Sequence, residues 1–173
     1  DWGNPQEPTI LFLHGWGQTG HIWDFLSLSL RSRYHCVALD LRGHGDSNWA
    51  IDGDYSLNAH ISDLAGVLQT FGQKPVILVG LSLGGRTSYV FAAQHPNLVQ
   101  RLIIVDSGPE TSKTSITEIR SFMELPDELD TFDQFVDRVH KYNHLRPIEQ
   151  IQASLRHNLA QLSNGKWTWK YDP

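Results

Sequence analysis

The sequence predicts an α/β fold, a doubly wound parallel sheet with right-handed crossovers. Short apolar runs recur along the first part of the chain, and each is continuous rather than alternating, as strands covered on both faces require. Segments with the apolar spacing of helices separate these runs. This strand–helix–strand alternation is typical of a parallel sheet with helices on both of its faces. The apolar runs lie at residues 9–13, 36–39, 76–79 and 102–105.

The helices between the runs carry start and stop signals. Ser56 is a suitable N-cap for the second helix, whose apolar side chains form one stripe. The third helix is expected to end near Gln94, because the residue before Pro96 is disfavoured in a helix. The expected helices lie near residues 23–30, 56–71 and 83–94.

From about Gly108 the pattern changes to helices alone, with no further strand. Capping boxes at Ser115-x-x-Glu118 and Thr131-x-x-Gln134 predict two helix starts. Pro147 suits the first turn of another helix, whose apolar face runs to Leu162 and ends at the sequence Ser-Asn-Gly. The expected organisation is a partial core at residues 1–108, a helical cap at 109–166 and a return toward the core at 167–173.

Composition restricts the possible partners. The 173 residues are one domain's worth of chain, and their net charge of −5 argues against nucleic acid or an anionic membrane as the main partner. No apolar run reaches the length of a membrane span. The single cysteine, Cys36, excludes an intrachain disulfide and fits a cytoplasmic compartment. Because Cys36 opens an apolar run, we expect its thiol to be buried and inert.

The candidate nucleophile is Ser82, at the centre of the G-x-S-x-G pattern that begins at Gly80. This pattern leaves a buried strand and enters a helix, and that context separates a nucleophilic serine from a chance match. A serine hydroxyl is a poor nucleophile unless the backbone turns it toward a base and an oxyanion site. Glycines two residues before and two after Ser82 permit such a cramped turn.

Two further motifs occur in order on the expected elements. His14-Gly15 ends the first apolar run, and residues 40–47 read D-L-R-G-H-G-D-S after the second. Together with the serine motif, they make the chain resemble the α/β-hydrolase family, in its esterase-like, serine-nucleophile branch. The resemblance implies that Ser82 attacks a carbonyl carbon and that the backbone N–H groups of Trp16 and Leu83 bind the oxyanion. It implies no metal and no organic cofactor.

The resemblance also implies a substrate class, an ester or related acyl compound. The Phe, Met and Leu content of the cap favours a moderately apolar small molecule. Two alternatives remain open. One is a carbon–carbon bond hydrolase that acts on a diketone-like acid with the same triad, and the other is a ligand-sensing member that signals through a partner. The sequence gives no indication of oligomeric state.

The chain departs from the family pattern after the serine motif. The family places its acid and its histidine on loops after later strands, whereas only one apolar run follows Ser82 before the cap. The two strands that usually precede the first run are also missing. We therefore expect an internal fragment of a longer enzyme, with the catalytic base and acid outside this chain. The second and fourth strands would then be bare edges that invite aggregation.

Other polar residues have simpler interpretations. Asp106 follows the fourth run, where some relatives place their acid, but a structural role is favoured. His44 is expected to organise its own loop, and His14 to be a buried hydrogen-bonding residue rather than the base.

Three further polar groups lie in the second half of the core and in the cap. His140 and His144 are four apart on an expected helix, but an exposed cap surface is favoured over a metal site. The acidic residues between 124 and 130 are expected to form a solvated loop. Arg86 can face either the pocket or solvent.

Overall fold

The computed structural model describes residues 1–110, 117, 120–122 and 124–172. Its contacts divide the chain into two compact units, Asp1–Pro109 and Glu110–Pro173.

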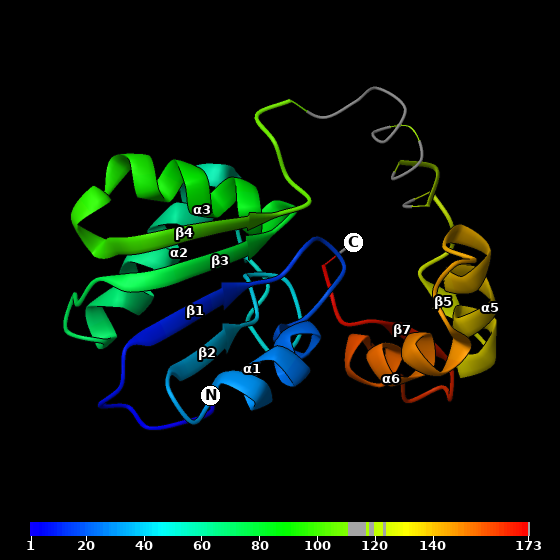
Figure 1. Ribbon diagram of the computed structural model, residues 1–173. Coiled ribbons are helices and arrows are strands. Elements are labelled where there is room, and N and C mark those ends of the chain that lie inside the picture. The colour runs from blue at the N-terminus through cyan, green and yellow to red at the C-terminus, as the bar shows by residue number, and fades with distance from the viewer. Residues whose placement is uncertain (111–116, 118–119, 123, 173) are drawn as a thin grey trace. The chain divides into compact units, whose positions relative to one another are not determined.

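The first unit is built on a parallel sheet with the strand order β2-β1-β3-β4 (Figure 1). Leu13 at the end of β1 pairs with Leu39 of β2 and with Gly80 of β3, so the carboxyl ends of the strands share one edge. The four predicted runs are confirmed as strands, although β4 begins three residues earlier than predicted. The strands are β1 (Thr9–Leu13), β2 (His35–Leu39), β3 (Val76–Leu81) and β4 (Val99–Val105).

The helices of this unit match the sequence prediction closely. The Ser56 side chain accepts a 3.2 Å hydrogen bond from the Ala59 N–H, as expected of an N-cap. The third helix ends at Gln94, before Pro96. The elements are the 3₁₀ helix η1 (Gly20–Trp23), α1 (Asp24–Leu30), α2 (Leu57–Thr70), α3 (Leu83–Gln94) and the 3₁₀ helix η2 (Pro96–Leu98).

The sheet separates two apolar cores, which is what a doubly wound fold requires. On one face Leu11 packs with Leu68 of α2 and Phe91 of α3, and all three are fully buried. On the other face Phe12 stacks on Trp23 with ring centroids 5.1 Å apart. Cys36 belongs to this second core and is fully buried, which confirms the expected burial of its thiol, and burial raises its pKa. Each large buried side chain contributes about 1.5–3 kcal/mol.

The strands β2 and β4 are the two edges of the described sheet, as expected. Trp2 covers part of the β2 edge, because its N–H and C=O exchange hydrogen bonds of 2.8 Å with Cys36. The other edge is more open. Leu102, Ile103 and Val105 of β4 are 39–49% exposed.

The second unit has its own small antiparallel sheet, with the order β5-β7-β6, and its own core. Its capping box is confirmed at Thr131, whose hydroxyl accepts from the Gln134 N–H while the Gln134 Oε1 accepts from the Thr131 N–H. Phe135, Ile151 and Trp169 are among its buried residues. The elements are β5 (Glu128–Leu129), α5 (Phe132–Tyr142), α6 (Ile148–Asn158), β6 (Leu159–Gln161) and β7 (Trp167–Trp169).

The expectation of helices alone in this unit was wrong. The last helix ends at Asn158, and Leu159 begins a hairpin whose strands pair Leu159 with Trp169. The Ser-Asn-Gly sequence is the hairpin turn rather than a helix stop, and Gly165 takes a φ of 86° there. The alternating Trp-Thr-Trp residues favour a strand, and strand pairing overrides the helical spacing. The capping box at Ser115-x-x-Glu118 lies outside the described residues.

Among the described residues, no helix combines the length and the apolar character that a membrane span needs.

Candidate active site

Ser82 lies between β3 and α3, and its backbone is unusual. Its φ of 50° and ψ of −110° are outside the regions that non-glycine residues normally occupy. Such a conformation costs about 1–3 kcal/mol and persists only where surrounding contacts hold it. Two contacts do so here. The Ser82 N–H donates to the Val105 carbonyl at 3.0 Å, and the Ser82 carbonyl accepts from the Arg86 N–H at 2.9 Å.

The two glycines of the motif allow this turn because the backbone packs closely around them. A Cβ at Gly80 would overlap the Gly84 carbonyl oxygen. A Cβ at Gly84 would lie 2.5 Å from the Leu13 carbonyl oxygen, on the neighbouring strand β1. Real Cβ atoms do not approach oxygen so closely, so both positions require glycine.

The first turn of α3 offers a backbone donor next to Ser82. The Leu83 N–H is at the first helical position, where no partner exists within the helix. Among the described residues, no group accepts a hydrogen bond from this N–H. The next amide, that of Gly84, donates to the His14 carbonyl at 3.1 Å and ties the helix start to the end of β1. The positive end of the helix dipole favours negative charge here.

His14 is fully buried, and its ring bridges two loops. Its Nε2 accepts a 2.9 Å hydrogen bond from the Leu41 N–H, so its Nδ1 carries the proton and donates to the Gly15 carbonyl at 2.7 Å. Both ring nitrogens are therefore occupied. Burial lowers the pKa of His14 from 6.5 to about 4. His14 is thus the buried hydrogen-bonding residue that was expected.

The loop after His14 passes beside Ser82. A Cβ at Gly15 would lie 3.3 Å from the Ser82 Cβ. The Gly15 N–H donates to the Gln18 Oε1 at 3.0 Å, and the Gln18 N–H donates to the Gly15 carbonyl at 3.2 Å. Trp16, the predicted second oxyanion donor, lies in this closed turn and is half-buried. Sequence reasoning missed Gln18, whose only signal was an amide side chain three residues after the motif glycine.

The third motif forms a loop held by Asp40. The Asp40 carboxylate accepts from the N–H groups of Gly20, at 2.6 Å, and Asp46, at 2.9 Å. The Ser47 hydroxyl donates to the Asp40 carbonyl at 2.6 Å. A Cβ at Gly45 would overlap the Asp40 carboxylate, so close packing as well as hydrogen bonding requires the residue types of this motif at this spacing.

Arg42 anchors the same loop to α2. Its Nε and Nη2 bind the two Asp63 carboxylate oxygens at 2.6 and 2.7 Å, and its Nη1 donates to the Asp54 carbonyl at 2.6 Å. The hydrogen bond with Asp63 raises the pKa of Arg42. This bidentate geometry is specific to a guanidinium.

The remaining candidates are placed as follows. His44 is buried, its Nδ1 is 3.0 Å from the Arg42 carbonyl, and its ring centroid lies 5.1 Å from that of His14. This is the loop-organising position expected of it, and burial lowers its pKa. Asp106, directly after β4, has a φ of 49° and is exposed. Arg86 on α3 is also exposed, which decides the question that the sequence left open.

The histidine pair of the second unit does not share a helix. The helix α5 ends at Tyr142, so His140 lies on it whereas His144 lies in the following loop. The sequence-based interpretation, which favoured a surface over a metal site, had placed both on one helix, and that placement was wrong.

With this geometry established, comparison with known proteins decides the family. A family model described as the alpha/beta hydrolase fold matches residues 8–171. The chain belongs to the α/β-hydrolase family. The esterase Rv0045c of Mycobacterium tuberculosis is 34% identical over 177 residues, covering 99% of this chain and 58% of that protein.

Two other comparisons agree with this assignment. The 2-(acetamidomethylene)succinate hydrolase of Mesorhizobium japonicum is 36% identical, over 65% of this chain and 41% of that protein. The crystal structure of a protein from Rickettsia typhi superposes with a TM-score of 0.90 at 21% identity, over 99% of this chain and 62% of that one, which shows the shared fold. The chain thus spans less than two thirds of the length of these relatives.

Proposed function

We propose that this α/β-hydrolase is a serine hydrolase that cleaves a carboxylic ester or a related acyl compound through an acyl-Ser82 intermediate. The observation that carries the proposal is the strained backbone of Ser82 at the start of α3, with φ at 50°. Strain of this kind is retained where function needs it, and here it holds the serine at the carboxyl edge of a parallel sheet. The similarity to an esterase supports the substrate class.

The proposed reaction begins with attack of the Ser82 Oγ on the carbonyl carbon of the substrate. The Oγ proton passes to a general base and then to the departing alcohol. The negative charge on the carbonyl oxygen is stabilised by the N–H groups of Leu83 and Trp16, and each such donor is worth about 3 kcal/mol in the transition state. Water then attacks the acyl-serine and gives a proton to the same base, the acyl–Oγ bond breaks, and the base returns the proton to the Ser82 Oγ as the acid leaves.

The proposal assigns the general base and its acid partner to residues outside these 173. His14 is not the base in this proposal, because its two ring nitrogens are occupied by hydrogen bonds with Leu41 and Gly15. Asp106 and His44 keep structural roles in the proposal. No metal or cofactor takes part in it.

A fluorophosphonate probe tests the nucleophile. We expect slow labelling of the chain, and we expect added imidazole to accelerate it by supplying a base. Ser82→Ala should abolish the label, whereas the matched control Ser62→Ala, on the exposed side of α2, should leave it unchanged. Labelling that persists in Ser82→Ala overturns the assignment.

Two further results address the other parts of the proposal. Labelling that is fast without imidazole, and that imidazole does not accelerate, places a base within the chain. Hydrolysis of p-nitrophenyl butyrate should also depend on Ser82 and on imidazole. Ligand binding without either labelling or turnover, even with imidazole, favours the sensing alternative and contradicts the enzyme.

A further inference from the structure

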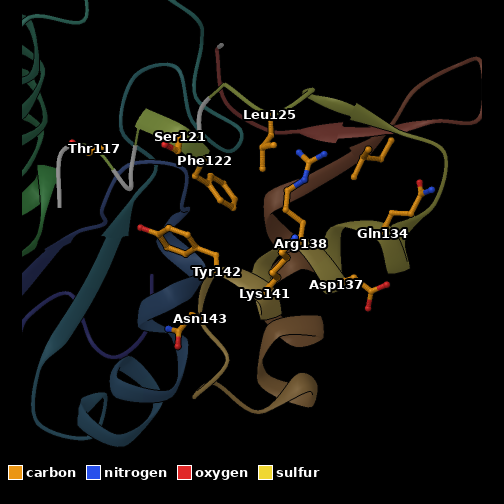
Figure 2. Close-up of a pocket in the computed structure, with 11 residues that line it drawn as sticks. Thr117, Ser121, Phe122, Leu125, Gln134, Asp137, Arg138, Lys141, Tyr142 and Asn143 are labelled. Carbon is orange, nitrogen blue, oxygen red and sulfur yellow. The ribbon is translucent and has the colours of Figure 1, made fainter. Parts of the chain in front are cut away.

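The unit Glu110–Pro173 contains a cavity of about 940 Å³ (Figure 2). It lies between α5 and the segment that carries Phe122 and Leu125, and it is confined to this unit. Its size is in the range of small-molecule sites. The described residues that line it include Phe122, Leu125, Leu129, Arg138, Lys141 and Tyr142.

One wall of the cavity is aromatic. The rings of Phe122 and Tyr142 are tilted by 56° with centroids 5.0 Å apart, and the centroid of Phe122 is 6.0 Å from that of Trp169. Trp169 is buried in the core of the unit, whereas Phe122 is half-buried and Tyr142 is half-exposed. The aromatic wall therefore has a fixed base and an accessible face, which suits an apolar ligand.

The other wall carries two cations. Arg138 is half-buried, its Nη1 donates to the Pro126 carbonyl at 2.6 Å, and its guanidinium lies 5.2 Å from the centre of the Phe135 ring. Lys141 follows three residues later, on the same side of α5. Within the described part of the chain, neither side chain has a carboxylate within salt-bridge distance.

Two acids lie near this wall, Asp137, which also lines the cavity, and Asp127. Figure 2 shows the Asp137 carboxylate pointing away from the Arg138 guanidinium. Asp127 is engaged with the Tyr171 hydroxyl, whose pKa is raised by burial first and by Asp127 second. Burial lowers the pKa of Arg138, as expected for a cation that has lost part of its water, and the nearby Tyr171 and Asp127 only partly oppose this shift. An anion that entered the cavity would recover that lost stabilisation.

We propose that this cavity binds an amphiphilic carboxylate. The carboxylate lies against Arg138 and Lys141, and the apolar body lies along Phe122 and Tyr142. The guanidinium suits a carboxylate because its N–H groups form a planar fork that two oxygens can accept from together. The site does not depend on Ser82, so its test is a binding measurement rather than an activity.

Octanoate is a suitable probe, titrated against the chain with tryptophan fluorescence as the readout, because Trp169 adjoins Phe122. We expect saturable binding of octanoate and at least a tenfold weaker response to octanamide, which has the same chain without the charge. Arg138→Gln should weaken octanoate binding at least tenfold, and Arg138→Lys should restore only part of it. Lys166→Gln, which removes an exposed cation elsewhere in the same unit, is the matched control and should bind like the wild type.

Two results overturn the proposal. Equal binding of octanamide and octanoate shows an apolar cavity without an anion site. Equal binding of octanoate by Arg138→Gln and by the wild type shows that the cation is not involved. Circular dichroism melts of each variant distinguish loss of binding from loss of fold, and Arg138→Lys provides the comparison if Arg138→Gln unfolds.

Discussion

The packing at Gly84 allows a sharp test, because we expect the same substitution to have opposite effects on stability at two helical glycines, Gly84 and Gly66. At Gly84 a new Cβ would lie 2.5 Å from the Leu13 carbonyl oxygen and 2.7 Å from the His14 carbonyl oxygen. Both atoms belong to the backbone of β1 and its end, which cannot rotate away. At Gly66, in the middle of α2, the new Cβ would meet nothing within 4 Å.

The magnitudes follow from these contacts. Forcing a methyl group into packed backbone costs about 1–3 kcal/mol. Moving α3 away from β1 also breaks the hydrogen bond from Gly84 to His14, which is worth about 1 kcal/mol. For Gly84→Ala we expect a net loss of about 2–3 kcal/mol after the better helix propensity of alanine is included. For Gly66→Ala only the propensity term applies, so we expect a gain of about 0.5–1 kcal/mol.

Urea denaturation of both variants, monitored by circular dichroism, measures these changes. The fluorophosphonate labelling rate of Gly84→Ala should also fall by about a hundredfold, because a displacement of about 1 Å misplaces the nucleophile. If Gly84→Ala is as stable as Gly66→Ala, the close approach of α3 and β1 does not exist as described, and the geometric argument for Ser82 fails with it.

Two further perturbations have expected outcomes. Because the pKa of His14 falls from 6.5 to about 4 on folding, the unfolded state binds the proton first. The wild type should therefore lose up to about 3 kcal/mol relative to His14→Gln as the pH falls from 7 to 4 in urea titrations, and parallel curves contradict this. Arg42→Gln should cost about 1–2 kcal/mol, since Asp63 is partly exposed, and a double-mutant cycle with Asp63→Asn should show coupling between the two residues. Additive effects in that cycle mean that the bidentate pair does not stabilise the loop.

Much of the first unit was predictable from the sequence, for a local reason. The apolar runs and the Ser56 N-cap specify strands and helices within a few residues of chain, and the parallel sheet follows from their alternation. The end of α3 at Gln94 needed only Pro96. The serine motif could likewise be placed at a strand–helix turn, because an apolar run precedes Gly80 and a helix follows Gly84.

The second unit shows where local reasoning fails. Leu159 and Leu162 continue a helical stripe, yet Leu159 pairs with Trp169 in a hairpin. The spacing of apolar residues cannot distinguish a longer helix from a hairpin, because the strand pairing that decides between them is made with residues ten positions away. Gln18 was missed for a related reason, because its bond to Gly15 appears only once the loop closes.

The sequence by itself determined the order of strands and helices in the core, the family resemblance and the identity of the candidate nucleophile, since each depends on residues close together in the chain. Only the tertiary structure decided the strain at Ser82, the neutral tautomer of His14 and the cationic wall beside Phe122. Each of these is set by backbone or side-chain groups brought together from separate elements, and their energies depend on distance and burial that no spacing encodes.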